Sequence, residues 1–294
     1  MSAASVLPVG PSPKTAFVLA GGGSLGAVQV GMLKALMAHG TKPDLVVGAS
    51  AGAINGAYLA ARPDSAGIEQ LERLWTTTQR RHIFPMTIRT LARVVVKRDF
   101  LLETAPLQSL IERNLPYRLL EQAAVPIHIV TTDFLSGEMV VLSSGPAAQA
   151  IVASCSIPAA FPAVGIGKRH LVDGGLVSNT PIKLARDLGA TRLIILPTGH
   201  ACALRLPPRG AISSALHGLT LLVAGQIVKE LETLDAACDF HVVPSLCPLG
   251  STAYDFTHTR ALIDRAEQQT LDWLNTGGLD RCDIPDALRP HSHF

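Results

Sequence analysis

The chain lacks long apolar segments and carries little net charge, and both absences exclude classes of protein. No stretch of about 18 uncharged apolar residues occurs, so the sequence predicts no membrane-spanning helix. The formal net charge is +2 over 294 residues, aromatic residues make up only 4%, and no basic cluster is interleaved with aromatics. Nucleic acid is therefore not an expected partner.

Cysteine is also scarce. The chain contains five cysteines, an odd number, at scattered positions without a C-x-x-C pair: Cys155, Cys202, Cys238, Cys247 and Cys282. This pattern predicts neither a disulfide framework nor a structural zinc site, and it favours a reducing compartment. Residues 1–13 are rich in Ser, Ala and Pro but have no basic start and no apolar core, which predicts a disordered tail rather than a signal peptide. We therefore expect a cytoplasmic protein.

Hydrophobic residues, in contrast, make up 48% of the chain, enough for a sheet that is buried on both faces. Short aliphatic runs alternate with helical patterns, which predicts a doubly wound α/β fold with a mostly parallel sheet and helices on both faces. The expected strands are residues 15–20, 45–47, 127–132, 139–142, a short strand ending at Asp173, 192–196 and 240–243. We expect one large domain, with residues 187–294 continuing the domain that begins at residue 14.

Residues 80–120 interrupt this alternation, because they have helical character and little strand character. Their place in the chain predicts a helical cap that covers the site described below. Arg89, Arg93 and Lys97 share one helical face with apolar neighbours, so the face is either an ordinary solvated one or a peripheral contact with anionic lipid at the inner membrane surface. Further on, the apolar residues 215–228 predict a buried helix that continues to residue 232.

The most specific motif is Gly48-Ala49-Ser50-Ala51-Gly52, a G-x-S-x-G pentapeptide between an apolar run and a helical run. A serine on such a strand-to-helix turn is strained and exposes its hydroxyl. The glycines remove the Cβ atoms that would block the turn, and the N-terminus of the following helix favours developing negative charge. Ser50 is therefore a candidate nucleophile.

A second glycine cluster, Gly21-Gly22-Gly23-Ser24-Leu25-Gly26, lies between the first strand and a helix over residues 27–37. Its backbone amides form a cradle for an anion, either a pyrophosphate bound to G-x-G-x-x-G or the oxyanion of an acyl intermediate. Dinucleotide binding needs an acidic residue at the end of the second strand. That strand ends at Ser50 instead, and Asp44 precedes it, so the pattern favours an oxyanion hole.

A serine nucleophile needs a base, and none of the ten histidines follows a strand in a glycine-rich setting. Asp173 does, since it closes a short strand and is followed by Gly174 and Gly175. With an ordinary pKa of about 3.9 its carboxylate is a poor base, so the role requires desolvation, which the apolar residues before it would favour. Taken alone, the segment would be an ordinary Asp-Gly-Gly turn.

In this order, the three motifs resemble those of the patatin-like phospholipase family, over roughly residues 16–186. The resemblance implies a three-layer sandwich, a catalytic domain at residues 14–186 and a Ser–Asp dyad in which histidine has no part. Ser50 would be the nucleophile on an elbow flanked by Gly48 and Gly52, and Asp173 of the Asp-Gly-Gly motif would be the base. The implied oxyanion loop comprises Gly21, Gly22, Gly23, Ser24 and Gly26, with amides of Gly22 and Gly23, and of Ser24, as donors.

One position departs from the family pattern. Leu25 stands where members often carry Arg or Lys, so neutral lipids, lysophospholipids and simple esters stay open beside phospholipids. The expected function is a serine acyl hydrolase acting on fatty acyl esters of lipids, without metal or cofactor. Three alternatives remain: a transacylase with the same dyad, a nucleotide-binding protein and a regulatory protein that binds lipid without turnover.

Overall fold

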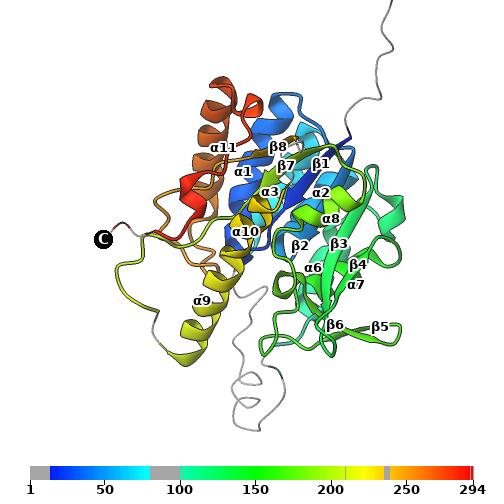
Figure 1. Cartoon of the computed structure of the whole chain (residues 1–294). Helices are drawn as coiled ribbons and strands as arrows, with labels where there is room; N and C mark the ends of the chain where they lie inside the picture. The colour runs from blue at the N-terminus through cyan, green and yellow to red at the C-terminus, as the bar shows by residue number, and fades with distance from the viewer. Residues whose placement is uncertain are drawn as a thin grey trace, which may run out of the picture.

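The computed structural model describes residues 14–79, 100, 102–208, 210–234, 239–291 and 293. They form an α/β fold around one mixed, mostly parallel sheet in the order β5-β6-β3-β2-β1-β7-β8, with β4 paired to β3 (Figure 1). The strands are β1 (Thr15–Leu19), β2 (Leu45–Ala49), β3 (Ile127–Asp133), β4 (Met139–Leu142), β5 (Val164–Ile166), β6 (Arg169–Asp173), β7 (Arg192–Leu196) and β8 (Asp239–Val242). The predicted fold class is confirmed.

Strand direction divides the sheet into two parts. The strands β3, β2, β1, β7 and β8 are all parallel to one another. β4 and β6 both run antiparallel to β3, and β5 runs antiparallel to β6. Because β1 and β2 are parallel neighbours, the glycine loop after β1 and the serine turn after β2 leave the sheet at the same edge.

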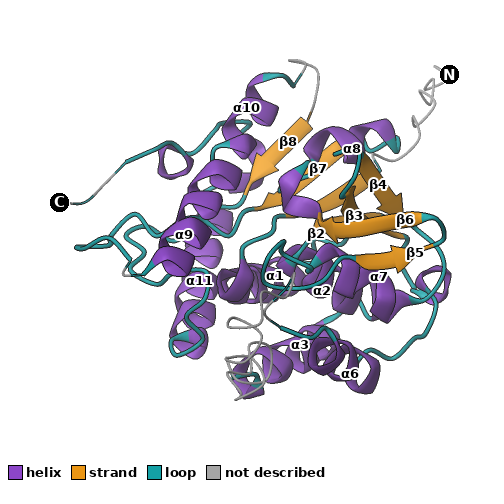
Figure 2. Cartoon of the chain, turned by 90° about the horizontal axis from the view of Figure 1, so that it is seen from below, coloured by secondary structure: helices purple, strands orange, loops and turns teal. Residues whose placement is uncertain are grey.

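Helices cover both faces of the sheet, which gives three layers (Figure 2). On one side α8 packs against β1, β2 and β7, and α10 packs against α8; on the other side α2 packs against β1, β2 and β3. The helices are α1 (Gly26–Ala38), α2 (Ala51–Ala61), α3 (Ser65–Thr77), α6 (Ala105–Asn114), α7 (Ala147–Ser154), α8 (Ile182–Asp187), α9 (Ala211–Ala224), α10 (Gln226–Glu232) and α11 (Thr259–Asn275).

The alternation of side chains along the central strands produces two separate cores. Phe17 and Leu19 of β1 point into a core shared with α1, α2 and α11. Ala16 and Val18 of the same strand point into a second core that includes Ile182 of α8 and residues of α10. The strand is apolar at consecutive positions because both of its faces are buried, as in other parallel sheets.

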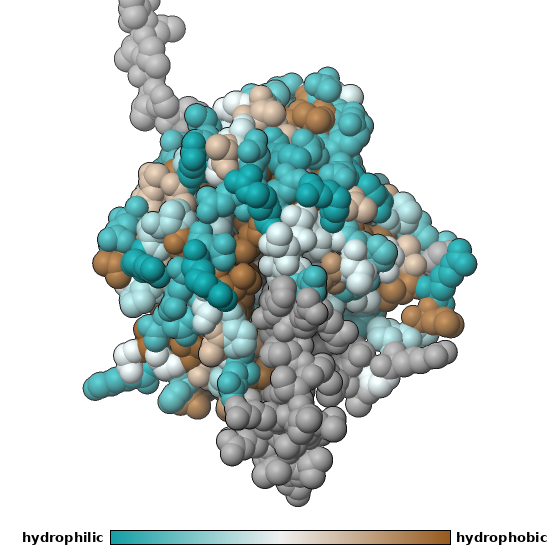
Figure 3. Space-filling view, turned by 180° about the vertical axis from the view of Figure 1, so that it is seen from behind, coloured by the Kyte–Doolittle hydropathy of each residue, from teal (hydrophilic) through white to brown (hydrophobic). Residues whose placement is uncertain are grey.

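The segment predicted as one buried helix is different in the structure. It forms two helices, α9 and α10, separated at Gly225, and α9 leaves Leu221 48% and Leu222 73% exposed. The prediction of burial was wrong because apolar composition alone does not show which side of a helix has a partner. None of the helices within the described residues is long and apolar enough to span a bilayer. Over the coloured part of the rear surface, hydrophilic residues are interspersed with apolar ones (Figure 3).

The predicted cap falls largely outside the described residues, which omit 80–99 and 101. Arg89, Arg93 and Lys97 are among those omitted, so a basic lipid-contacting face remains a prediction. The part of the predicted cap that the structure describes includes α6, which packs against α7.

Candidate active site

Ser50 lies on a sharp turn between β2 and α2, with φ +53° and ψ −122°. A non-glycine residue in this region is strained, and such strain persists only where the surroundings enforce it. They do so here through close packing: a Cβ on Gly52 would collide with the backbone of Leu19, and one on Gly48 with the backbone of Gly52. The two glycines therefore let strand and helix approach closely enough to hold Ser50 in this conformation.

The hydroxyl of Ser50 donates a hydrogen bond of 2.7 Å from Oγ to Oδ2 of Asp173. Both side chains are buried, at 8% and 7% exposure. The other carboxylate oxygen, Oδ1, accepts from the backbone amide of Gly175 at 2.8 Å, which fixes the orientation of the carboxylate. Two residues 123 positions apart in sequence are thus joined in the geometry of a nucleophile and a base.

Burial raises the pKa of Asp173 to about 6, against the lowering effect of its hydrogen bonds from Ser50 and Gly175. This is the desolvation that a carboxylate needs to act as a base at neutral pH, since an ordinary aspartate is too weakly basic. The neighbouring thiol of Cys155 also has a raised pKa, through burial and the charge of Asp173. Cys155 is therefore a protonated, inert neighbour rather than a competing nucleophile.

The register of β3 brings the two motifs together. Ala49 at the end of β2 pairs with Val130 of β3, and the next residue of β3, Thr131, pairs with Asp173 of β6. Because β6 is antiparallel to β3, it runs back toward the middle of that strand and ends beside the Ser50 turn. The hydroxyl of Thr132 bonds to the carbonyl of Asp173 at 2.8 Å and fixes this end.

Two of the four amides at the start of the glycine loop, those of Gly21 and Ser24, are already used in backbone hydrogen bonds. The amide of Gly21 donates to the carbonyl of Asn179 at 2.9 Å, and that of Ser24 donates to the carbonyl of Ala253 at 2.8 Å. Residues Gly23–Leu25 form a short 3-10 helix, and the backbone amide of Gly26 caps it by donating to the carbonyls of Gly23 and Ser24. Within the described part of the chain, the amides of Gly22 and Gly23 have no such acceptor, and both residues line the pocket that contains Ser50 and Asp173.

A buried polar network holds this loop, and the sequence reading missed it. Asn55 of α2 donates to the carbonyl of Gly26 at 2.9 Å and to the side chain of Gln29 at 2.8 Å, and it accepts from the indole of Trp75 at 2.7 Å. Gln29 donates to the carbonyls of Ala20 and Leu196. Both amide side chains are fully buried. Their positions within otherwise apolar helical runs were a usable signal, because buried polar groups need partners.

A second support acts on the nucleophile turn itself. The backbone amide of Ser50 donates to Oγ of Ser154 at 2.8 Å, and that hydroxyl donates to the carbonyl of Val130 at 2.6 Å. On the other side of the site, the hydroxyl of Thr198 donates to the carbonyl of Gly21 at 2.7 Å. The sequence gives no signal for Thr198, because a lone threonine carries no pattern of its own, whereas Ser154 belongs to a segment, residues 153–162, that shares in the family resemblance.

The pocket around the dyad is small, about 60 Å³, and mostly apolar. Its apolar walls are formed by Ile157, Pro158, Leu176, Leu219, Val223, Ala253 and Tyr254. Among the described residues, no histidine lines it. Leu25, which replaces the basic residue of the family pattern, is 1% exposed and packs in the core beside α1.

The placement of Asp44 bears on which of the two anions considered fits the glycine loop. Its carboxylate accepts from the amide of Thr15 at 2.7 Å, at the start of β1 and β2. That is the edge of the sheet opposite the loop, so Asp44 cannot bind the ribose of a dinucleotide held there. The residues present fit an oxyanion better than a pyrophosphate.

The fold and site define an α/β protein with a serine on a strand-to-helix turn and a buried aspartate beside it. Comparison with known families agrees with the resemblance seen in the sequence, since the model of the patatin-like phospholipase family matches residues 17–186. The chain belongs to this family, which is one of carboxylic ester hydrolases.

Three curated relatives illustrate the range of the family. Patatin-like phospholipase domain-containing protein ZK370.4 of Caenorhabditis elegans is 30% identical over 184 residues, 62% of this chain and 13% of that protein. Patatin-like phospholipase domain-containing protein 7 of Rattus norvegicus is 28% identical over 186 residues, 63% of this chain and 13% of that protein. Neuropathy target esterase sws of Drosophila melanogaster is 27% identical over 186 residues, which are 62% of this chain and 13% of that protein. This chain therefore matches only a small part of each of these relatives.

Proposed function

We propose that this protein is a serine acyl hydrolase that cleaves fatty acyl esters of lipids through a Ser50–Asp173 dyad. The observation that carries the proposal is the 2.7 Å hydrogen bond between Ser50 Oγ and Asp173 Oδ2. It lies in an apolar pocket beside two amides, those of Gly22 and Gly23, that have no acceptor within the described residues.

In the proposed mechanism, Asp173 removes the proton of Ser50 as its oxygen attacks the ester carbonyl. The amides of Gly22 and Gly23 stabilise the oxyanion, and the N-terminus of α2 adds favourable potential. The protonated Asp173 then gives its proton to the leaving alcohol. Water then attacks the acyl-enzyme with Asp173 again as the base; as the bond to Ser50 breaks, Asp173 returns this proton to Oγ of Ser50 and the fatty acid departs.

The apolar walls of the pocket fit the acyl part of a substrate. The volume of about 60 Å³ is far below the roughly 300–1,000 Å³ of ordinary ligand pockets, so the pocket must widen for a lipid to enter, and we propose that α9, which contributes Leu219 and Val223, is the wall that moves. The same helix exposes Leu221 and Leu222 to solvent. We propose that this apolar face contacts a lipid surface as the pocket opens, in a protein that meets membranes peripherally from the cytoplasm.

The test is hydrolysis of p-nitrophenyl esters of increasing acyl length by the wild type, Ser50→Ala and Ser65→Ala. Ser65 is an exposed serine at the start of α3, outside the pocket, and serves as the matched control. We expect turnover by the wild type and the control, loss in Ser50→Ala, and a preference for longer chains. Activity that survives in Ser50→Ala would contradict the mechanism. Analysis of products with added glycerol or lysolipid distinguishes a hydrolase from a transacylase, and lipid binding without turnover would indicate a regulatory protein.

A further inference from the structure

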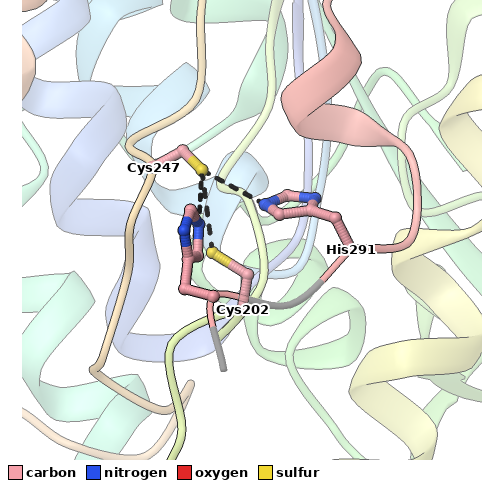
Figure 4. Close-up of side chains that lie close together, drawn as sticks. Cys202, Cys247 and His291 are labelled. Atoms are coloured by element: carbon pink, nitrogen blue, oxygen red, sulfur yellow. Dashed lines mark hydrogen bonds between the residues drawn. The ribbon is translucent and has the colours of Figure 1, made fainter.

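Four side chains of the type that bind metals gather outside the proposed active site. Their ligand atoms, one each from Cys202, Cys247, His291 and His293, all lie within 4.8 Å of one another. The Cys202 and Cys247 sulfurs are 3.9 Å apart. The sulfur of Cys247 lies 3.1 Å from Nε2 of His291 and 3.0 Å from Nε2 of His293 (Figure 4).

These separations match the edges of a tetrahedral zinc site. With Zn–S bonds of about 2.3 Å and Zn–N bonds of about 2.0–2.1 Å, tetrahedral geometry puts the ligand atoms about 3.3–3.8 Å apart. The observed sulfur–sulfur distance is close to the upper value, and the two sulfur–nitrogen distances lie slightly below the range. Small side-chain movements would therefore place all four atoms at bonding distance from one ion. Two thiolates and two imidazoles are also a donor set that zinc prefers.

The surroundings orient the ligands as they would be around a metal. Nδ1 of His291 lies 2.7 Å from the carbonyl of Arg289. A carbonyl can only accept, so Nδ1 carries the proton and Nε2 presents its lone pair to the cluster. On the opposite side, the backbone amide of Leu249 donates to the sulfur of Cys202 at 3.4 Å. Hydrogen bonds of these two kinds hold the ligands of structural zinc sites in place.

Three distant segments supply the four ligands. Cys202 follows β7 and Cys247 follows β8, so both lie on loops after adjacent parallel strands, while His291 and His293 lie close to the last residue. Their spacing of 45, 44 and 2 positions resembles no short zinc motif, which is why the sequence led us to expect no such site. Sheet topology, rather than local sequence, creates the cluster.

We propose that Cys202, Cys247, His291 and His293 bind one structural zinc ion that ties the C-terminal residues to the loops after β7 and β8. With four protein ligands, the site has no open position for substrate. The loop after β7 also carries Thr198, whose hydroxyl supports the carbonyl of Gly21. Zinc would thus steady the loop on which the glycine cluster rests.

A second group of possible ligands, Asp239, His241 and Cys282, is a weaker candidate. Nε2 of His241 lies 2.8 Å from Oδ1 of Asp239, and its other nitrogen lies 3.0 Å from the carbonyl of Arg281. The group offers three ligand atoms rather than four, two of them on exposed side chains, and the carboxylate of Asp239 also lies 3.4 Å from Nε of Arg192. Cys282 is therefore a useful control, because its removal deletes a thiol without touching the proposed site.

The experiment measures zinc in the untagged full-length chain, purified under reducing conditions without chelators. We expect about one zinc per chain in the wild type and in Cys282→Ser, and less than about 0.1 in Cys247→Ser and in a His291→Ala/His293→Ala double variant. Zinc that is absent from the wild type, or equal in the wild type and the ligand variants, would overturn the proposal.

A second measurement uses the wild-type chain alone, so that it does not depend on the folding of a variant. After zinc is exchanged for Co²⁺, the thiolate charge-transfer and tetrahedral d–d absorption bands should appear at one equivalent. Octahedral bands only, or no binding, would contradict the site. Non-reducing mass spectrometry checks the remaining alternative, because a Cys202–Cys247 disulfide in the freshly purified chain would replace the metal.

Discussion

Replacing Asp173 by Asn should make the protein more stable at neutral pH while it abolishes activity. The side chain is 7% exposed, and its burial raises the pKa from 3.8 to about 6. An asparagine has nearly the same shape and can still accept from the amide of Gly175 and meet the hydroxyl of Ser50. It removes the charge that the pocket desolvates, so the folded state no longer bears that cost.

The size and sign follow from proton linkage. Between pH 3.8 and about 6 the folded carboxyl holds a proton that the unfolded one has lost, so the free energy of unfolding falls as pH rises through this window. Above about pH 6 the full cost is present. A shift of about two pKa units corresponds to about 3 kcal/mol. We therefore expect Asp173→Asn to gain up to about 3 kcal/mol over the wild type near neutral pH, and that advantage to vanish near pH 4.

Urea unfolding of both proteins at pH 4 and pH 7.5 measures this gain directly. Asp133→Asn is the matched control, since Asp133 is also buried but faces Arg169 at 3.8 Å and accepts from the amide of Leu135. That variant should lose stability rather than gain it. The same difference between Asp173→Asn and the wild type at both pH values would refute the desolvation argument. The ester turnover of Asp173→Asn should fall by about 10²–10⁴-fold, because this variant has lost the proposed base.

Further predictions concern the same site. The kcat/KM of the wild type should fall about tenfold per pH unit below about pH 6, as Asp173 takes up its proton, which a pH–rate profile would show. Gly22→Pro should lower kcat by at least about 10²–10³-fold, because it removes a proposed oxyanion donor and cannot keep the extended backbone of Gly22 beside Thr198; near-normal turnover would rule out that role. Asn55→Ala should cost about 3 kcal/mol in urea unfolding, because it leaves the buried indole N–H of Trp75 and the carbonyl oxygens of Gly26 and Gln29 without partners. Ser154→Ala should cost about 1–3 kcal/mol and also lower kcat, since the amide of Ser50 loses its acceptor; unchanged kcat would restrict Ser154 to a structural role.

The parts of the site that follow strands β1 and β2 could be predicted because each is encoded locally. The glycine loop and the Gly48–Gly52 turn each join an apolar run to a helical run, and parallel neighbours expose such turns at one edge. Burial on both faces also made the central strands visible as continuous apolar segments. The short strand β5 was missed, since three residues give no measurable periodicity.

Long-range features could not be predicted, because no local pattern encodes them. Asn55 and Gln29 are visible as polar residues in apolar helices, but their shared support of the glycine loop depends on how α1 and α2 pack. The exposure of Leu222 depends likewise on which side of α9 has a neighbour. In each case the residue type was informative, whereas the partner was set by the fold.

The meeting of Ser50 and Asp173 shows where local reasoning ends. Because β6 runs antiparallel to β3, its last residue, Asp173, lies opposite Thr131 rather than opposite Asp133 at the end of β3. The reversal of β6 turns the end of the strand inward, which both brings the carboxylate to the serine and buries it. The antiparallel pairing that brings Asp173 to Ser50 also buries the carboxylate and so raises its pKa, which gives the position and the basicity of the proposed base one structural cause.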